Sequence, residues 1–257
     1  MKEFFKGNPT WFTTGGGVKE RRQDTIANFH HAISLGSEVI RTNVDLTADG
    51  KLISFSDEAA LWLRSQKKSI SSLSAADITK QYRGYLKNSR QPDAPMLNDD
   101  IEGLFPEVRD LLDEFPAQRF NFALSGRDPN IVARLHNTIG TADEWRILIS
   151  SWDAKTIKNV RALGSTVSCS FSLSGFVGTY ALHRTGFMFA KKKFAHDALI
   201  VPEVVGVSYI VNRQLVRQLH DRGVRVYILG VETREQVNRL REAGVDGFIT
   251  GNLPACL

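Results

Sequence analysis

A chain of 257 residues is long enough for one large α/β domain, and 42% hydrophobic with 24% charged residues is typical of a soluble globular protein rather than a disordered one. The net charge of +5 favours phosphate-bearing partners, and two cysteines exclude a disulfide-rich scaffold and fit no zinc or redox spacing. Because the sequence shows no run of about 18 apolar residues and no signal peptide, we expect a cytoplasmic protein.

Short apolar segments with strand character alternate with amphipathic helical segments along the whole chain. This order predicts parallel strands joined by crossover helices, and the number of units favours a closed, TIM-type (β/α)8 barrel. Expected helices include Thr25–Leu35, Asn212–Arg222 and Thr233–Ala243, the last with Gly244 as its C-cap. The expected strands are Trp11–Thr14, Glu38–Leu46, Lys51–Phe55, Phe120–Leu124, Arg146–Ser150, Thr166–Phe171, Ala198–Val201, Arg225–Leu229 and Gly247–Thr250.

A polar stretch rich in lysine and serine interrupts the alternation between residues 57 and 95. It is too long for a bare loop, so we expect a small excursion with one or two helices. No linker separates it from the rest, and the sequence predicts a single domain over residues 1–257.

Several segments occur in a characteristic order: DTIANFHHAISLGSEVIRTNVDLTADGKLISFSDE, then APMLNDDIEGLFP, ALIVPEV and the closing AGVDGFITGNLP. Together they resemble the glycerophosphodiester phosphodiesterase family over almost the whole chain. The resemblance implies a barrel that hydrolyses phosphoric diesters in lipid metabolism. It also implies a Mg²⁺ or Ca²⁺ ion held by three carboxylates and two histidines for acid and base catalysis.

The sequence departs from the family pattern at the positions that perform this chemistry. A cation, an amide and a methyl group stand where the family has metal-binding carboxylates, and hydroxyls replace the two histidines. A hard divalent cation needs several oxygen ligands and gains most of its affinity from charged carboxylates, and hydroxyls do not transfer protons near neutral pH as imidazoles do, so we expect no metal, no cofactor and no family catalysis. These degenerate positions are Thr14, Gly15, Arg41, Asn43, Ser56, Ala123 and Ser125.

Further departures follow the same pattern at neighbouring positions. Gln23-Asp24 replaces the family's Glu-Asn pair, Leu229 replaces a tryptophan, and Gly251 replaces the closing aspartate.

Two functional interpretations of the altered site stay open. In the first, Arg41 and the backbone N–H groups of Gly15 and Gly16 bind a phosphate-containing ligand without cleaving it, because guanidinium matches phosphate oxygens. Lys19, Arg21 and Arg22 would add positive charge nearby, and Asn43, Asp45 and Glu203 would complete the binding site.

In the second interpretation, Asp45, Asp57 and Glu203 form a displaced metal site and the protein remains a phosphodiesterase. Arg41, Asn43 and Asp45 share one face of their strand, so all three are expected to point into the barrel. A structural alternative is that Arg41 pairs with Asp45 or Glu203 in a buried salt bridge.

No other motif competes with this site. The histidines fit no catalytic triad, and neither a dinucleotide-binding glycine pattern nor a P-loop is present, so we expect no nucleic-acid partner. The segment Phe176–Phe194 combines aromatic residues with three lysines and either contacts a membrane surface or an acidic partner, or is a packed helix with solvated lysines.

Overall fold

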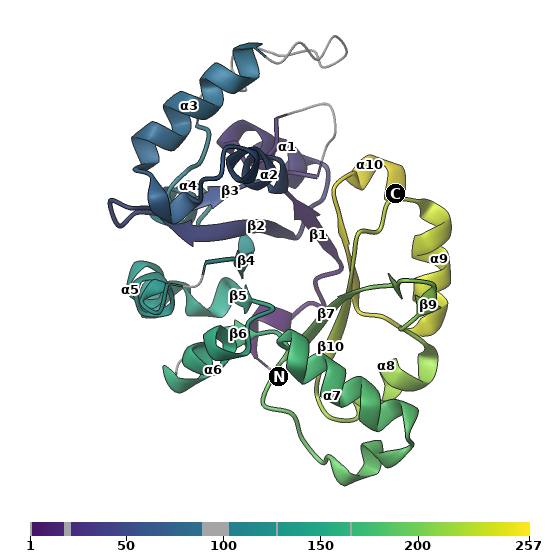
Figure 1. The fold of residues 1–257 in the computed structure, drawn as a ribbon. Coiled ribbons are helices and arrows are strands. Elements are labelled where there is room, and N and C mark those ends of the chain that lie inside the picture. The colour runs from purple at the N-terminus through teal and green to yellow at the C-terminus, as the bar shows by residue number, and fades with distance from the viewer. Residues whose placement is uncertain (1, 18–21, 89–102, 127, 165) are drawn as a thin grey trace.

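The computed structural model describes residues 2–17, 22–88, 103–126, 128–164 and 166–257 (Figure 1). In this part of the chain, eight parallel strands follow one another in the order β6-β5-β4-β2-β1-β11-β10-β7. A parallel bridge between Ser170 and Ala198 joins the two ends of this order. The strands therefore form a nearly closed barrel with helices around it, and the predicted fold class is confirmed.

The elements agree closely with the predicted ranges. The predicted strand Thr166–Phe171 shortens to two residues, and Gly244 caps its helix in the left-handed conformation. The barrel strands are β1 (Trp11–Thr14), β2 (Val39–Leu46), β4 (Arg119–Leu124), β5 (Ile147–Ser150), β6 (Ser168–Cys169), β7 (Ala198–Pro202), β10 (Arg225–Leu229) and β11 (Gly247–Thr250). The helices around them are α1 (Ile26–Ser34), α4 (Val108–Glu114), α5 (Ile131–Asp143), α6 (Ala154–Ala162), α7 (Leu173–Arg184), α8 (Arg213–His220), α9 (Arg234–Ala243) and α10 (Leu253–Cys256).

The predicted excursion contains two helices, α2 (Asp57–Ser65) and α3 (Ala75–Asn88). The strand before it, β3 (Leu52–Phe55), pairs antiparallel with β2 and lies outside the ring of barrel strands. Trp62 and Tyr82 pack the two helices together, with ring centroids 5.1 Å apart. The rest of the predicted insertion, residues 89–95, and the start of the APMLNDD segment lie outside the described residues.

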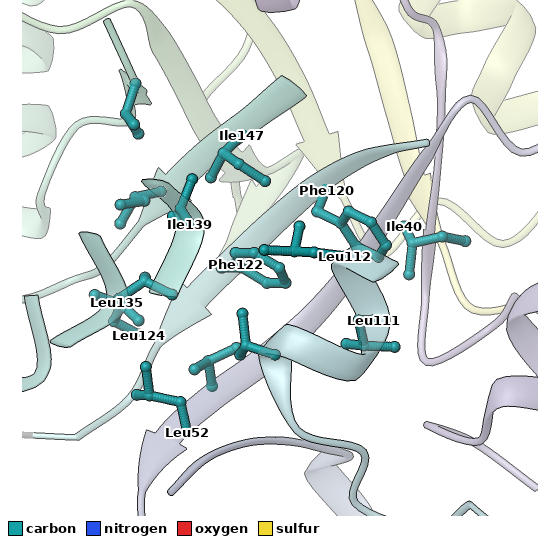
Figure 2. Packing of buried hydrophobic residues seen from close by; sticks show 14 of the residues in the cluster. Ile40, Leu52, Leu111, Leu112, Phe120, Phe122, Leu124, Leu135, Ile139 and Ile147 are labelled. Atoms are coloured by element: carbon teal, nitrogen blue, oxygen red, sulfur yellow. The ribbon is translucent and has the colours of Figure 1, made fainter. Parts of the chain in front are cut away.

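Strand alternation assigns each residue of β4 to one of two environments. Phe120 and Phe122 point toward the surrounding helices and stack with ring centroids 5.3 Å apart (Figure 2). Their contacts with leucine and isoleucine side chains bury apolar surface, which stabilises the fold by about 1.5–3 kcal/mol for each large side chain. Asn121, Ala123 and Ser125 point the other way, toward the barrel interior. The same alternation places Arg41 and Asn43 of β2 inside.

Aromatic side chains fill the amino-terminal part of the barrel. Phe4 and Phe5, in a short 3₁₀ turn before β1, are buried with Phe12 and Tyr227. The Phe12 and Tyr227 ring centroids are 4.5 Å apart. Side chains fill this end of the barrel, so space for a ligand is expected at the opposite end, where the strands have their carboxyl ends.

Candidate functional site

A cavity of about 570 Å³ opens at the carboxyl ends of the barrel strands. TIM-barrel proteins place their substrates at this end. Every barrel strand, or the residue directly after it, contributes to the wall through Thr14, Arg41, Ala123, Ser150, Ser170, Ile200, Leu229 and Ile249.

Most positions that depart from the family pattern lie around this cavity. Ser56 is the N-cap of α2, and its hydroxyl accepts a hydrogen bond from the Ala59 N–H at 3.1 Å. Those that line the cavity are Thr14, Gln23, Arg41, Asn43, Ala123, Ser125, Leu229 and Gly251.

Arg41 lines the cavity, and the side chains that accept hydrogen bonds from its guanidinium are neutral. Nη1 donates to Asn121 Oδ1 at 3.0 Å and to Ser150 Oγ at 3.3 Å. Burial lowers the pKa of Arg41 to about 10, while the negative charges of Asp57 and Asp24 oppose that shift. The guanidinium is therefore protonated at neutral pH. Among the described residues no carboxylate forms an ion pair with it.

Asn43 links β2 to the start of α2. Its side-chain amide donates to Asp57 Oδ1 at 2.9 Å and to the Phe55 carbonyl at 3.2 Å. This amide holds Asp57 at the cavity wall, at the first residue of α2, where a negative charge is stabilised by the helix dipole.

Asp24 is a buried carboxylic acid beneath the cavity and has a positive φ of 54°. Its Oδ1 accepts hydrogen bonds from the hydroxyls of Thr42 and Ser54, the latter at 3.1 Å. Burial raises the pKa of Asp24 to about 6, and the charge of Asp57 adds to the increase, although both hydroxyls and Arg41 oppose it. Asp24 therefore changes its charge close to physiological pH.

Replacing Asp24 with Asn should stabilise the protein at neutral pH. The folded-state pKa of about 6 exceeds the ordinary value of 3.8, so the folded state binds this proton more tightly. The stabilisation that the folded state gains from protonated Asp24 is complete below the unfolded-state pKa of 3.8 and is lost as pH rises through about 6. Urea unfolding should show a variant more stable than wild type by about 2–3 kcal/mol at neutral pH, with no difference near pH 4. A difference that does not depend on pH would contradict the raised pKa.

The prediction that the glycine turn presents free N–H groups to a ligand is wrong for Gly15. The Gly15 N–H donates to the Arg41 carbonyl at 3.1 Å, and the Gly17 N–H donates to the Thr14 carbonyl at 3.0 Å. Gly16 is buried against Asn28 of α1. The Gly15 N–H joins the turn to β2, and the Gly15 carbonyl accepts a hydrogen bond from the Asn28 side chain of α1 at 2.9 Å, so the role of Gly15 here is structural.

Replacing Gly16 with Ala should destabilise the fold by about 2–3 kcal/mol, measured by chemical unfolding. Its φ is +103°, and a Cβ would lie 2.2 Å from the Asn28 side chain. Gly36 is the matched control, because its φ of +98° is similar but no atom lies within 4 Å of a Cβ. Equal losses for both Ala variants would show that contact with Asn28 is unimportant.

The sequence also placed Lys19, Arg21 and Arg22 near this turn. Lys19 and Arg21 lie outside the described residues. Arg22 forms an ion pair with Glu58 of α2 at 3.4 Å, so at least part of its charge is used within the fold.

The predicted metal cluster of Asp45, Asp57 and Glu203 is not formed, and the predicted salt bridge of Arg41 to Asp45 or Glu203 is also wrong. β2 continues beyond its last pairing with β4, Val44 opposite Leu124, so Asp45 lies past the barrel rim. There its Oδ1 accepts the Leu46 N–H at 2.7 Å.

Glu203 is buried and binds Arg239 of α9 through two hydrogen bonds of 2.7 and 2.8 Å. Neither Asp45 nor Glu203 lines the cavity. Within the described ranges, no group of three or more histidines, cysteines or carboxylates could hold a metal ion.

A family model described as the glycerophosphoryl diester phosphodiesterase family matches residues 15–253. The chain belongs to this family. A glycerophosphodiester phosphodiesterase of Caldanaerobacter subterraneus subsp. tengcongensis is 24% identical over 249 residues, covering 91% of this chain and 90% of the relative.

Solved structures of family members share the barrel. A glycerophosphodiester phosphodiesterase from Thermotoga maritima has a TM-score of 0.68 at 15% identity, over 95% of both chains. An Oleispira antarctica phosphodiesterase, solved in complex with the product sn-glycerol-3-phosphate, has a TM-score of 0.71 at 14% identity, over 96% of this chain and 95% of that one.

The family's divalent cation does not fit the residues present in this chain. A guanidinium, an amide and a methyl group, from Arg41, Asn43 and Ala123, stand at the three positions that the family resemblance assigns to ligands. A hard cation requires several oxygen ligands, most of them charged, and a neighbouring guanidinium repels it.

The segment Phe176–Phe194 forms most of α7 and the 3₁₀ turn Phe187–Ala190. Phe176, Met188 and Phe194 are buried, whereas Phe187 and Phe189 are exposed. Among the described residues, no helix combines the length and apolar character needed to cross a membrane.

Sequence reasoning missed several side chains of the cavity. Asn121 and Ser150 hold Arg41 in place, and Trp152 forms part of the wall. Asn121 could have been found, because it is a polar residue between two phenylalanines, and strand alternation places it on the inward face of β4. Ser150 and Trp152 required knowledge of where β5 ends relative to its neighbours.

Proposed function

We propose that this barrel binds a phosphate-containing ligand at Arg41 and does not cleave it by the metal-dependent route of its family. The main supporting observation is a half-buried, protonated guanidinium in the barrel cavity with neutral hydrogen-bond partners. A guanidinium has five N–H donors, and both side-chain hydrogen bonds of Arg41 within the described residues use Nη1, so Nη2 and Nε are left to donate to a ligand.

The wall of the cavity adds the hydroxyl group of Ser125, which is suited to a phosphate oxygen, whereas the Ser151 hydroxyl donates to the Leu124 carbonyl at 3.0 Å. It also contains the carboxylates of Asp57 and Glu232. Because these carboxylates repel additional negative charge, the site favours a phosphodiester, with one charge, over a ligand with several. A glycerophosphodiester has this charge and is the substrate class implied by the family.

Loss of cleavage follows from the positions that have changed. Thr14 and Ser56 stand where the family has histidines, and hydroxyls do not exchange protons near neutral pH as imidazoles do. Without these groups and without the carboxylates for a cation, the chain has no described group that could activate water by the family route.

Titration calorimetry with glycerophosphocholine tests binding directly. We expect saturable binding at up to millimolar ligand, no released choline in excess Mg²⁺ or Ca²⁺, and no rise in melting temperature on adding either ion alone. No binding at millimolar ligand would contradict the anion site. Released choline, or a melting temperature raised by the metal, would instead support a phosphodiesterase with displaced ligands.

A further inference from the structure

Exposed apolar side chains gather at the end of the barrel where the cavity opens. Thirteen large apolar side chains are exposed among the described residues, and nine of these lie in segments that follow the adjacent strands β5, β6 and β7. Seven of the nine lie within ten residues of the end of the preceding barrel strand, and we call these seven the apolar rim: Trp152, Leu173, Val177, Val204, Val205, Val207 and Tyr209. A concentration of this kind on one edge is typical of a binding surface.

Part of the rim is a short hairpin held in a fixed position. It consists of β8 (Val204–Val205) and β9 (Ser208–Tyr209), of which β9 is labelled beside α9 in Figure 1, and Val207 at its tip is 99% exposed. Glu203 precedes the hairpin and binds Arg239, whose guanidinium also lies over the Tyr209 ring, 5.8 Å from its centroid. The fold therefore fixes an exposed apolar hairpin beside the cavity.

The cavity itself has a polar half and an apolar half. Most polar side chains come from β2, β4, β5 and α2, with Arg41 among them. The apolar half comes from β6, β7, β10 and β11 through Phe171, Ile200, Leu229 and Ile249, with Ser170 and Glu232 as the polar side chains on that side. Trp152 belongs to both the wall and the rim, and its carbonyl accepts the Leu173 N–H at 3.0 Å. An apolar surface thus continues from the interior of the cavity to its rim.

We infer that the ligand is a phosphodiester that bears one acyl chain, with its phosphate at Arg41 and its chain along the apolar half toward the rim. This inference rests on the proposed function and specifies its ligand. A cavity of about 570 Å³ has the size that holds one drug-sized molecule, which suits a headgroup and one chain better than a lipid with two chains.

The test is a chain-length series with one headgroup: glycerophosphocholine and its 1-hexanoyl and 1-decanoyl esters, titrated below their micelle concentrations. Full burial of a methylene strengthens binding about fourfold, so partial burial of the added methylenes should make the decanoyl ester bind at least about tenfold more tightly than the hexanoyl ester. Trp152→Ser and Leu173→Ser should each reduce this chain-length gain. Arg41→Met should weaken every member of the series by the same factor.

Trp145→Ser is the matched control, since Trp145 and Trp152 are exposed tryptophans on either side of β5 and only Trp152 lines the cavity. It should retain the full chain-length gain. Equal affinities across the series, with glycerophosphocholine bound, would overturn the acyl-chain inference and leave the anion site intact. No binding by any member would overturn both.

Three other results would overturn the acyl-chain inference. A gain unaffected by Trp152→Ser and Leu173→Ser would place the chain elsewhere. If affinity increased with chain length but Arg41→Met had no effect on binding, the acyl chain would bind without the phosphate at Arg41. If the protein sedimented with phosphatidylcholine vesicles and its affinity for the soluble esters did not depend on chain length, the apolar rim would be assigned to binding a lipid bilayer surface.

Discussion

Replacing Arg41 with Met should weaken glycerophosphocholine binding by about 100-fold, because hydrogen bonds to a charged group contribute about 1.5–3 kcal/mol each. The same change should leave the free energy of unfolding unchanged or raise it by about 1 kcal/mol, since Met fills a similar volume without a desolvated charge. Calorimetry and urea unfolding measure the two quantities. Weaker binding together with unchanged or higher stability is the result expected if Arg41 serves ligand binding rather than folding.

Arg239→Met is the control for this experiment. Arg239 is an exposed arginine whose carboxylate partner, Glu203, lies outside the cavity wall. Its replacement should lower stability and leave glycerophosphocholine binding unchanged. Undiminished binding by Arg41→Met would contradict the site. A loss of stability as large as the one expected for Arg146→Met, about 3–5 kcal/mol, would also contradict it.

Replacing Arg146 with Met should destabilise the fold by about 3–5 kcal/mol. Arg146 is 1% exposed and binds Asp143 through Nε at 2.8 Å and Nη2 at 2.7 Å. It also donates to the carbonyls of Leu112, Phe115 and Gln118, which end α4 and begin the turn to β4. Met would leave a carboxylate and several carbonyls without their donor.

Chemical unfolding of Arg146→Met gives the loss directly, and glycerophosphocholine binding at low temperature should be retained where the variant is folded. A destabilisation below about 1 kcal/mol would show that water replaces the guanidinium at these carbonyls. Arg146 and Arg41 therefore differ in their partners: the buried Arg146 has a carboxylate and carbonyls, whereas the half-buried Arg41 has an amide and a hydroxyl.

The barrel could be predicted from sequence because its pattern repeats locally. Alternation along β2 and β4 placed Arg41 and Asn43 inside without any knowledge of distant residues. The same rule failed for Asp45, because the point where β2 leaves the barrel is set by where β4 ends, at Leu124 opposite Val44. A local pattern does not contain this information.

The electrostatic features depended on contacts distant in sequence. Arg239 lies 36 residues from Glu203, and the hydroxyl partners of Asp24 come from two strands further along the chain. The glycine turn was misjudged for a related reason. Its N–H groups looked free in sequence, but the Arg41 carbonyl of the neighbouring strand accepts one of them.

The most direct test is the ³¹P NMR spectrum of glycerophosphocholine mixed with the protein and Mg²⁺ and followed over time. We predict that wild-type protein shifts or broadens the diester resonance, that Arg41→Met abolishes this effect, and that no phosphomonoester resonance appears. An unchanged diester resonance would contradict binding at Arg41. A growing monoester resonance that requires Mg²⁺ would show that the barrel still cleaves its ligand.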